Sequence, residues 1–186
     1  MKRLFDLVLV LVAASILAIP IGLIALVVRL TSFGPIFYWS ERVGRQNKIF
    51  KMPKFRSMRA GTPQVAKHLL ADPKKYITPI GSFLRKSSFD ELPQLWSILV
   101  GDMSFVGPRP ALFNQQDLID LRTRQGVHVL MPGLTGWAQV KGRDELSIPQ
   151  KVALDAEYLA LQGFWFDIKI LWMTFLKVMK RDGVSH

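Results

Sequence analysis

The sequence predicts an α+β protein that is mostly helical and attached to a membrane. One observation is a charge-free apolar segment near the N-terminus, from Leu7 to Val28. Another is a long apolar, amphipathic segment near the C-terminus, from Phe164 to Arg181. Between them lie short runs that mix apolar and cationic residues, which is typical of a few strands. We therefore expect a small β element within a largely helical chain.

The N-terminal apolar segment is long enough to cross a bilayer as a helix, because a helix rises about 1.5 Å per residue. Lys2 and Arg3 precede this segment. Cations also follow it closely, at Arg29, Arg42, Arg45 and Lys48. A spanning helix normally has an excess of positive charge on one flank only. Cations on both flanks indicate that both ends face the same side, although a simple crossing stays open.

A re-entrant helix-break-helix over residues 1–30 would keep both flanks on one side of the membrane. Pro20, with Gly22 close behind, can break or kink the helix, because proline lacks the amide hydrogen and clashes with the preceding turn. The chain would then dip into one leaflet, turn at Pro20 and return. A secretory signal peptide fits less well, because Asp6 lies in the leading region and no small-residue cleavage motif follows.

Two short strands are expected after the apolar segment. The first is Ile36 to Trp39, and the second lies within Ile49 to Met58. The second carries Lys54 and Arg56, which either face a phosphate-bearing ligand or lie along a solvated strand edge. The chain then makes an excursion over the surface, with one helical turn near residues 65–70.

The adjacent acids Asp90 and Glu91 lie where a helix is expected to begin. Ser88 with Glu91 fits the capping-box pattern, and Ser87 with Asp90 fits it as well. Pro93 follows closely and is tolerated only in a first turn, where the amides lack partners in any case. The helix is therefore predicted to start at or just before Asp90.

This helix is expected to run from about Asp90 to Val100, with Gly101 at its C-terminal end. The positive end of its dipole favours an ionised carboxylate and also a bound phosphate. Arg85 precedes the acids and Arg109 follows them. A carboxylate in this setting can attack phosphorus or hold a metal ion. The plain alternative is an acidic helix start that does no chemistry.

A stiff arginine and a glycine-rich run follow the acids. Arg109 stands between Pro108 and Pro110, so its backbone is restrained and its guanidinium suits either a phosphate or a structural salt bridge. The run from Met131 to Arg143 contains several glycines, which can bring backbone amides close to a ligand. A glycine-rich loop alone is a weak signal.

Three helices are expected in the last part of the chain, at Leu112 to Gln125, Pro149 to Gln162 and from Phe164 onward. The last has a polar stripe made by Asp167, Thr174, Lys177 and Arg181. Its remaining face carries Phe164, Trp165, Ile168, Trp172, Phe175 and Met179. This pattern is typical of an interfacial amphipathic helix, and packing in the core is the alternative.

Composition narrows the classes of partner and site. A formal net charge of +11 with 49% hydrophobic residues favours an anionic membrane surface or phosphate-bearing ligands. The absence of cysteine excludes disulfides, thiolate nucleophiles and cysteine-bound zinc. A histidine metal cluster is not expected from His68, His128 and His186, which we interpret as surface residues. Nucleic acid is not an expected partner, because no recognition helix or aromatic platform is visible.

Three runs together carry a family resemblance. They are F-K-M-P-K-F-R-S-M, D-E-L-P-Q-L-W-S-I-L-V-G-D-M-S-F-V-G-P-R-P and P-G-L-T-G-W-A-Q-V-K-G-R, in this order along the chain. The sequence thereby resembles the bacterial sugar transferases known as monotopic phosphoglycosyl transferases. The similarity covers nearly the whole chain and is closest to the minimal form of the family.

This resemblance implies an enzyme that moves a phosphosugar from a UDP-sugar to polyprenol phosphate, with Mg²⁺ required and UMP released. Asp90 would be the nucleophile and a metal ligand, forming a covalent phosphosugar intermediate. Glu91 would assist proton transfer or position the acceptor. The diphosphate and nucleotide would be bound by Lys54, Arg85, Arg109 and Arg143.

The resemblance also implies a membrane arrangement. Residues 1–30 would form the re-entrant membrane hairpin of a monotopic protein, and residues 31–186 a cytosol-facing catalytic domain with interfacial helices, in the bacterial inner membrane. Two positions depart from the family pattern: Ile19 replaces a serine before Pro20, and Met131 replaces an arginine.

A non-catalytic, basic module that binds the membrane surface is the rival hypothesis. It explains the charge, the hairpin and the last helix, but not an acid pair placed between arginines. The sequence leaves open which sugar is transferred, for which glycan, and whether the chain forms a homodimer.

Overall fold

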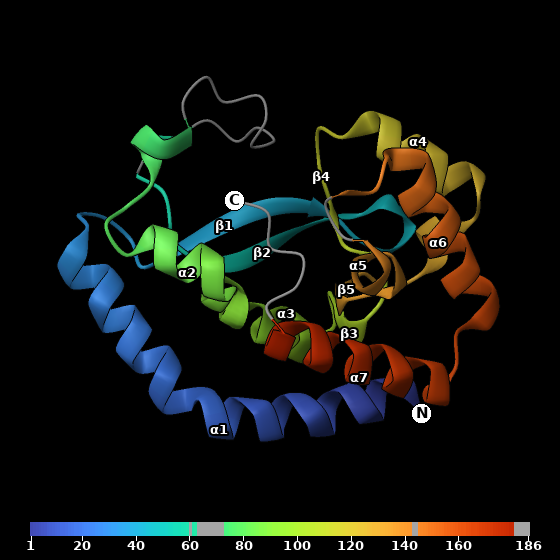
Figure 1. The fold of residues 1–186 in the computed structure, drawn as a ribbon, viewed down its shortest axis with the longest axis horizontal. Coiled ribbons are helices and arrows are strands. Elements are labelled where there is room, and N and C mark those ends of the chain that lie inside the picture. The colour runs from blue at the N-terminus through green and yellow to red at the C-terminus, as the bar shows by residue number, and fades with distance from the viewer. Residues whose placement is uncertain (60, 63–72, 143–144, 181–186) are drawn as a thin grey trace.

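Helices make up most of the structure, as predicted. The computed structural model describes residues 1–59, 61–62, 73–142 and 145–180 (Figure 1). The α-helices are α1 (Lys2–Thr31), α2 (Gly81–Ser87), α3 (Leu95–Val100), α4 (Gln116–Arg124), α5 (Trp137–Lys141), α6 (Ile148–Leu161) and α7 (Phe164–Lys180). Short 3₁₀ helices are η1 (Arg45–Asn47), η3 (Pro73–Tyr76), η4 (Phe89–Gln94) and η5 (Val127–Val129). The helical turn predicted near residues 65–70 lies outside the described residues.

The β element is small, as expected. Strands β1 (Phe37–Val43) and β2 (Ile49–Phe55) form an antiparallel pair, and β4 (Ala111–Leu112) joins the other edge of β1. Strands β3 (Ser104–Val106) and β5 (Gly133–Thr135) form a separate parallel pair. Strand β1 is longer than predicted. It extends to Val43 because the turn that follows is tight, with η1 leading directly into β2.

The N-terminal helix α1 continues through Pro20 without a break. The predicted helix-break-helix is therefore wrong as a description of the backbone, and a bend takes the place of the break. Figure 1 shows α1 bending about halfway along its length. A proline removes one hydrogen bond of the helix, which bends it without ending it when the residues on both sides remain helical.

The start of α1 is held by polar contacts to the rest of the protein. The Lys2 ammonium donates to the Val106 carbonyl at 3.0 Å and is paired with the carboxylate of Asp167 on α7. Arg3 donates to the Leu99 carbonyl at 2.7 Å, at the end of α3. Asp6 is buried and accepts from the Ser104 hydroxyl at 3.1 Å. The cations before the apolar segment therefore fasten α1 to the globular part of the protein.

The far end of α1 is fastened as well. Val28 is fully buried and packs with Phe55 of β2 and Leu84 of α2. Arg56 is also buried, and its guanidinium donates to the carbonyl and hydroxyl of Ser32, each at 2.6 Å. The alternative that Arg56 lies along a solvated strand edge is therefore wrong, because its side chain is buried and bonded to Ser32.

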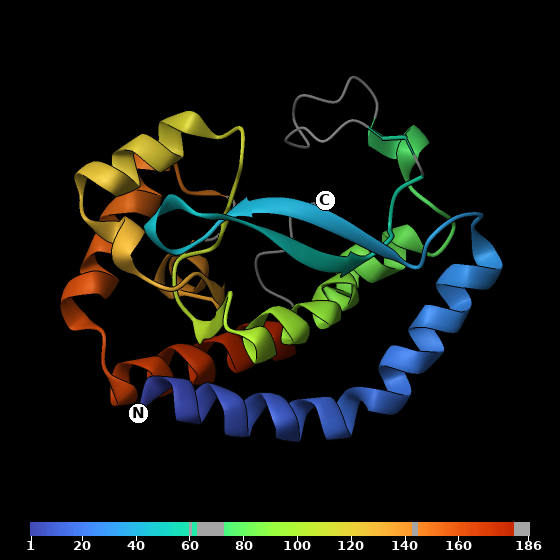
Figure 2. The ribbon, with the colours of Figure 1, turned by 180° about the vertical axis from the view of Figure 1, so that it is seen from behind.

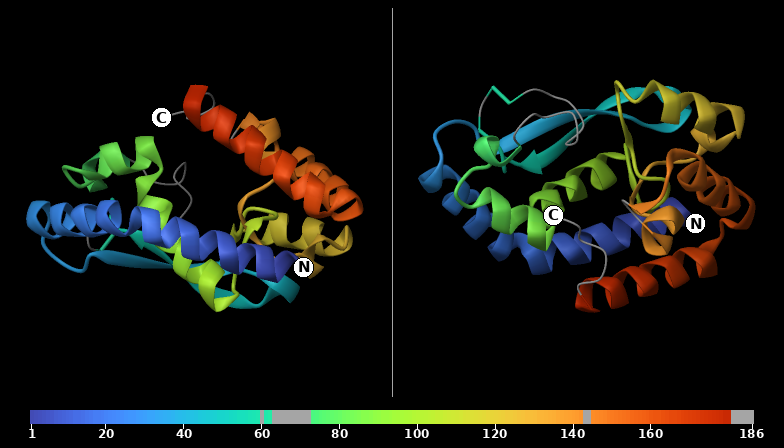
Figure 3. Two further views of the ribbon diagram at one scale, coloured as in Figure 1. Left: turned by 90° about the horizontal axis from the view of Figure 1, so that it is seen from below. Right: turned by 45° about the horizontal axis from the view of Figure 1, so that its top comes forward.

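Helix α7 turns its apolar face outward. Trp165 is 80% exposed and Trp172 60%, whereas Asp167 is only 5% exposed. Asp167 accepts from the Tyr158 hydroxyl at 2.6 Å, and the hydroxyls of Thr174 and Thr135 bond at 2.7 Å. Two members of the predicted polar stripe, Asp167 and Thr174, therefore face the protein, and Arg181 lies outside the described residues. Figure 3 shows α1 and α7 converging near the N-terminus and diverging along the same side of the molecule.

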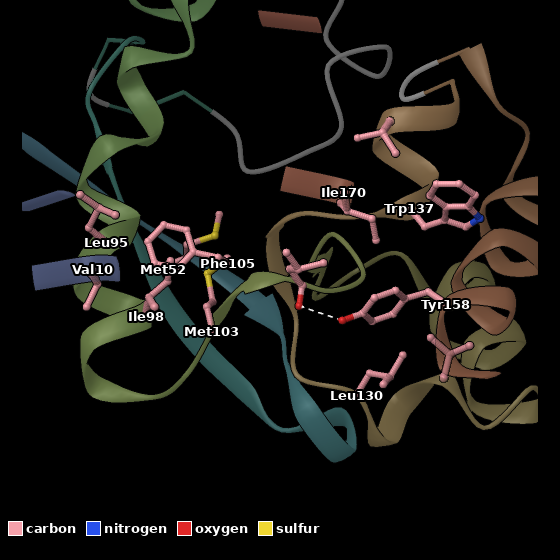
Figure 4. Packing of buried hydrophobic residues seen from close by; sticks show 13 residues of the cluster. Val10, Met52, Leu95, Ile98, Met103, Phe105, Leu130, Trp137, Tyr158 and Ile170 are labelled. Carbon is pink, nitrogen blue, oxygen red and sulfur yellow. Dashed lines mark hydrogen bonds between the residues drawn. The ribbon is translucent and has the colours of Figure 1, made fainter. Parts of the chain in front are cut away.

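The main core joins α1, α3, β2, β3 and the C-terminal helices. Ile98 and Ile170 are fully buried in it, with Met103 and Tyr158 close to fully buried (Figure 4). Figure 2 shows the segment η4–α3 running between the β1–β2 ribbon and α1. This packing fixes η4, and with it the acid pair, between the strands and the N-terminal helix.

Candidate active site

The acid pair lies at the start of a helical segment, as predicted. Asp90 and Glu91 are in the first turn of η4, which contains Pro93 and runs directly into α3. Gly101 ends α3 with a φ of 97°, in the left-handed region that favours glycine. The tight 3₁₀ turn accommodates the proline near its beginning.

The predicted capping boxes are wrong. Ser88 has a left-handed backbone with a φ of 58° and makes no side-chain cap. The Ser87 hydroxyl instead donates to the Phe83 carbonyl at 2.8 Å, within α2. Because α2 ends at Ser87 and η4 begins at Phe89, the serines form the link between two helices rather than the entry from an extended chain.

Glu91 is the centre of a cluster of charges. Its Oε1 accepts from the Lys54 ammonium at 2.7 Å and from the Arg109 guanidinium at 2.7 Å. Burial alone would raise the pKa of Glu91, but the charges of Arg109 and Lys54 outweigh it and hold that pKa well below its usual range. The structure therefore brings together three of the residues predicted for the site.

Asp90 has a different environment although it directly precedes Glu91 in the chain. Burial raises the pKa of Asp90, and the charge of Glu91 adds to this, while Lys54, Arg85 and Arg109 oppose it. Arg85, on α2, thus acts on Asp90 electrostatically, as expected for a site cation. Two adjacent carboxyl groups with pKa values moved in opposite directions are typical of a site that assigns them different tasks.

Arg42 belongs to the same cluster and was missed. Lys54 pairs with Tyr38 on β1, and alternate residues of a strand share a face, so Ser40 and Arg42 lie on the same face as Lys54. Burial lowers the pKa of Arg42 to about 10, and the positive charge of Arg109 adds to this effect. An extension of β1 beyond Trp39 would have revealed this alternation.

The Pro-Arg-Pro segment is fixed through its carbonyl groups. The Pro108 carbonyl accepts from the Gly133 amide at 2.9 Å, and the Arg109 carbonyl from the Arg122 guanidinium at 2.8 Å. The Pro110 carbonyl accepts from Arg42 at 3.2 Å. Because the two prolines also restrict the backbone, Arg109 is presented to Glu91 from a rigid support.

Arg122 is itself held by a buried partner. Two of its nitrogens donate to one carboxylate oxygen of Asp155, at 2.9 and 2.7 Å, and Asp155 is 1% exposed. This pair joins α4 to α6 behind the Pro-Arg-Pro segment. The sequence gives no local signal for it, because the two residues are far apart in the chain.

The glycine-rich loop packs against the protein's own backbone. A Cβ on Gly133 would overlap the Gly107 amide nitrogen, and one on Gly136 would overlap the Gly107 carbonyl oxygen. These glycines therefore allow β5 to approach the segment that leads into Pro108. Their close approach is explained without the ligand contact that the sequence suggested.

The other residues singled out in the sequence lie either away from the acid pair or outside the described residues. Arg143 and His68 lie outside the described residues. His128 is half-buried beside Arg122 in the wall of a small cavity. Met131 is half-buried, and its carbonyl lies against Gly107. Within the described part of the chain, no three His, Asp or Glu side chains gather in a way that could hold a metal ion by themselves.

Comparisons with a family model and with individual proteins point to the same family. The family model described as bacterial sugar transferase matches residues 1–181. A sugar transferase named EpsL from Bacillus subtilis (strain 168), described as uncharacterized, is 38% identical and is matched over 100% of this chain and 91% of its own length.

Two longer relatives carry more specific names. The undecaprenyl-phosphate galactose phosphotransferase of Salmonella typhimurium is 40% identical over 81% of this chain and 34% of its own length. The UDP-glucose:undecaprenyl-phosphate glucose-1-phosphate transferase of Escherichia coli (strain K12) is 38% identical over 95% of this chain and 40% of its own length. The chain thus spans well under half of these two relatives.

Proposed function

Because the chain belongs to the bacterial sugar transferase family, we propose that it is a phosphoglycosyl transferase that moves a phosphosugar from a UDP-sugar to polyprenol phosphate. The names of the longer relatives, which pair a sugar with undecaprenyl phosphate, support this class of acceptor. The observation that carries the proposal is that the two neighbouring acids have different environments. Glu91 is bonded to Lys54 and Arg109, whereas Asp90 has a raised pKa and hence a more basic carboxylate.

The proposed reaction has two displacements at one phosphorus. An ionised oxygen of Asp90 bonds to the phosphorus that carries the sugar, and the bond from this phosphorus to the bridging oxygen breaks. UMP leaves with the bridging oxygen and its electron pair. An oxygen of polyprenol phosphate then attacks the same phosphorus, and the bond to Asp90 breaks, which restores the carboxylate. A covalent intermediate of this kind leads to ping-pong kinetics.

Cations around Asp90 offset the charge of the phosphates. Lys54, Arg109, Arg85 and Arg42 all act on the acid pair, and fixed cations of this kind stabilise charge that develops on phosphorus. Glu91, with its lowered pKa and two charged donors, stays ionised and is a poor proton carrier. We therefore assign to Glu91 the positioning of Lys54 and Arg109 rather than proton transfer.

The residues present fit a magnesium ion that is shared with the substrate. Mg²⁺ is usually held by one or two carboxylates together with substrate phosphates. Asp90 offers one such carboxylate beside the cation cluster, and its second oxygen would remain for the attack on phosphorus. The bound ion would supply further neutralisation of the diphosphate charge.

A monotopic arrangement on the cytoplasmic face of the bacterial inner membrane is part of the proposal. Both ends of α1 are fastened to the same globular part, at Lys2 and at Val28, so a simple crossing would separate groups that are in contact. The apolar outer face of α7 suits the membrane interface. These contacts support α1 as a bent, re-entrant helix and residues 31–186 as the catalytic part.

Single cysteines test this arrangement, because the chain has no cysteine of its own. Leu4 is 68% exposed and Phe33 98% exposed, near the two ends of α1, and exposed Lys86 marks the globular part. An impermeant maleimide should label L4C, F33C and K86C in inside-out vesicles and none of them in right-side-out vesicles. Labelling of L4C and F33C from opposite sides would refute the re-entrant arrangement.

The activity itself is tested by release of UMP. The protein, reconstituted in lipid, is incubated with Mg²⁺, polyprenol phosphate and each of several UDP-sugars. We expect UMP release with at least one sugar, dependent on the acceptor for repeated turnover. No release with any sugar would contradict the proposed function and favour the non-catalytic membrane module.

A further inference from the structure

An apolar groove lies beside the acid pair and is not used by the chemistry described above. It has a volume of about 400 Å³ and lies between α1, the β1–β2 strands and the η4–α3 segment. Leu11 and Ala14 line it on α1, Trp39 and Pro53 on the strands, and Trp96 on α3. Leu11 is 58% exposed and Trp96 55% exposed, so the groove is open along its length. Among the described residues that line it, none carries a charged side chain.

The geometry of η4 places Asp90 at the end of this groove. A 3₁₀ helix has three residues per turn, so side chains three positions apart lie above one another. Asp90 therefore shares a row with Pro93, and the row continues to Trp96 in α3. Both Pro93 and Trp96 line the groove. Glu91 shares its row with Gln94, which is 2% exposed and faces the interior.

We propose that this groove holds the part of the acceptor's polyprenyl chain that adjoins its phosphate. The inference rests on the proposed function, since it names the place where that acceptor binds. A lipid lying along Pro93 and Trp96 has its hydrocarbon against an uncharged wall and its phosphate at Asp90. The cations that neighbour Asp90 complement the charge of that phosphate. In a phospholipid the glycerol separates the phosphodiester from the acyl chains, whereas in polyprenyl phosphate the phosphate is joined directly to the first isoprene unit. A second copy of the chain brings no phosphate at all.

The groove also gives the two substrates separate approaches. The interior row with Glu91 leads to Lys54 and Arg109, which suit the diphosphate of the water-soluble donor. The groove row leads along α1, the helix that we place in the membrane. The donor and the acceptor then approach Asp90 along different surfaces, which is compatible with a two-step transfer at one phosphorus.

A groove-filling variant tests the inference. Ala14 is exposed on α1, so Ala14→Trp adds bulk to the groove without entering the core. We expect the amount of phosphosugar adduct formed from UDP-sugar alone to be unchanged. The KM for polyprenol phosphate should rise about tenfold, as expected if about two methylene groups lose their burial. Val12→Trp is the matched control, because Val12 is 51% exposed, does not line the groove and lies on nearly the opposite face of α1.

Crosslinking gives an independent measurement. A polyprenyl phosphate with a diazirine on its first isoprene unit should label the peptides that contain Trp39 and Trp96. Unlabelled polyprenyl phosphate should compete and phosphatidylglycerol should not. Equal KM values for Ala14→Trp and Val12→Trp, competition by phosphatidylglycerol, or crosslinks only between two copies of the chain would each overturn the inference while adduct formation remains. Failure of the wild-type protein to form any adduct would instead refute the proposed function, and the inference with it.

Discussion

Asp90→Asn is expected to lower phosphosugar transfer by about 10⁴-fold or more, the scale on which loss of a covalent nucleophile acts. The asparagine amide is similar in shape to the carboxylate but cannot form the phosphosugar ester. UMP release in the presence of polyprenol phosphate measures the effect. Binding of the UDP-sugar should be affected much less, because Glu91, Lys54 and Arg109 retain their mutual contacts.

Asp102→Asn is the matched control for this substitution. Asp102 is an exposed carboxylate just after α3, outside the cation cluster. It should keep transfer activity close to that of the wild type. Near-normal UMP release by the Asp90 variant would remove the nucleophile from the proposed mechanism.

Arg122→Met is expected to lower the free energy of unfolding by about 3–5 kcal/mol, because it leaves Asp155 as a buried charge without its partner. Burial already raises the pKa of Asp155, and Arg122 is the charge that opposes this most. The variant also removes the donor to the Arg109 carbonyl. Denaturant unfolding in detergent measures the stability, and UMP release measures the activity.

A double variant separates the two consequences. Arg122→Met with Asp155→Leu removes both charges and should recover most of the lost stability, because an apolar pair can replace a buried ion pair. It does not restore the hydrogen bond to Arg109, so transfer activity should stay below the wild-type level. If the single variant were as stable as the wild type, the proposed role of the Arg122–Asp155 pair would be wrong.

Local signals in the sequence predicted much of the framework. The position of Pro93 placed the start of the helical segment to within one residue, because proline is tolerated best in the first turn of a helix. Gly101 marked the end of α3, and the spacing of polar residues indicated an amphipathic last helix, for which the interfacial and core-packing alternatives were both open. These features depend on a few neighbouring residues and are therefore readable from the sequence.

Features that depend on packing between distant segments were not predictable in the same way. Arg42 enters the site through the register of β1 and β2, and Arg122 through its contact with Asp155 in another helix. The capping pattern at Ser88 failed because α2 ends immediately before η4. In each of these cases an element distant in the chain or directly adjoining decided the outcome.

The course of α1 shows the same limit. Pro20 correctly indicated a distortion, but the sequence could not show that the helix would bend without breaking. Nor could it show that Lys2 and Arg3 serve as contacts to the protein, which gives their charge a structural role besides any effect on topology. Charge on both flanks nevertheless predicted that the two ends lie on the same side, and the contacts at both ends support this.

The intact mass of the wild-type protein after incubation with Mg²⁺ and UDP-sugar, without acceptor lipid, is the most direct test. An aspartyl nucleophile predicts an increase by one phosphosugar, located by fragmentation on the peptide that carries Asp90 and lost when polyprenol phosphate is added. UMP release in the complete reaction with no such adduct, or with the adduct on another residue, would contradict it.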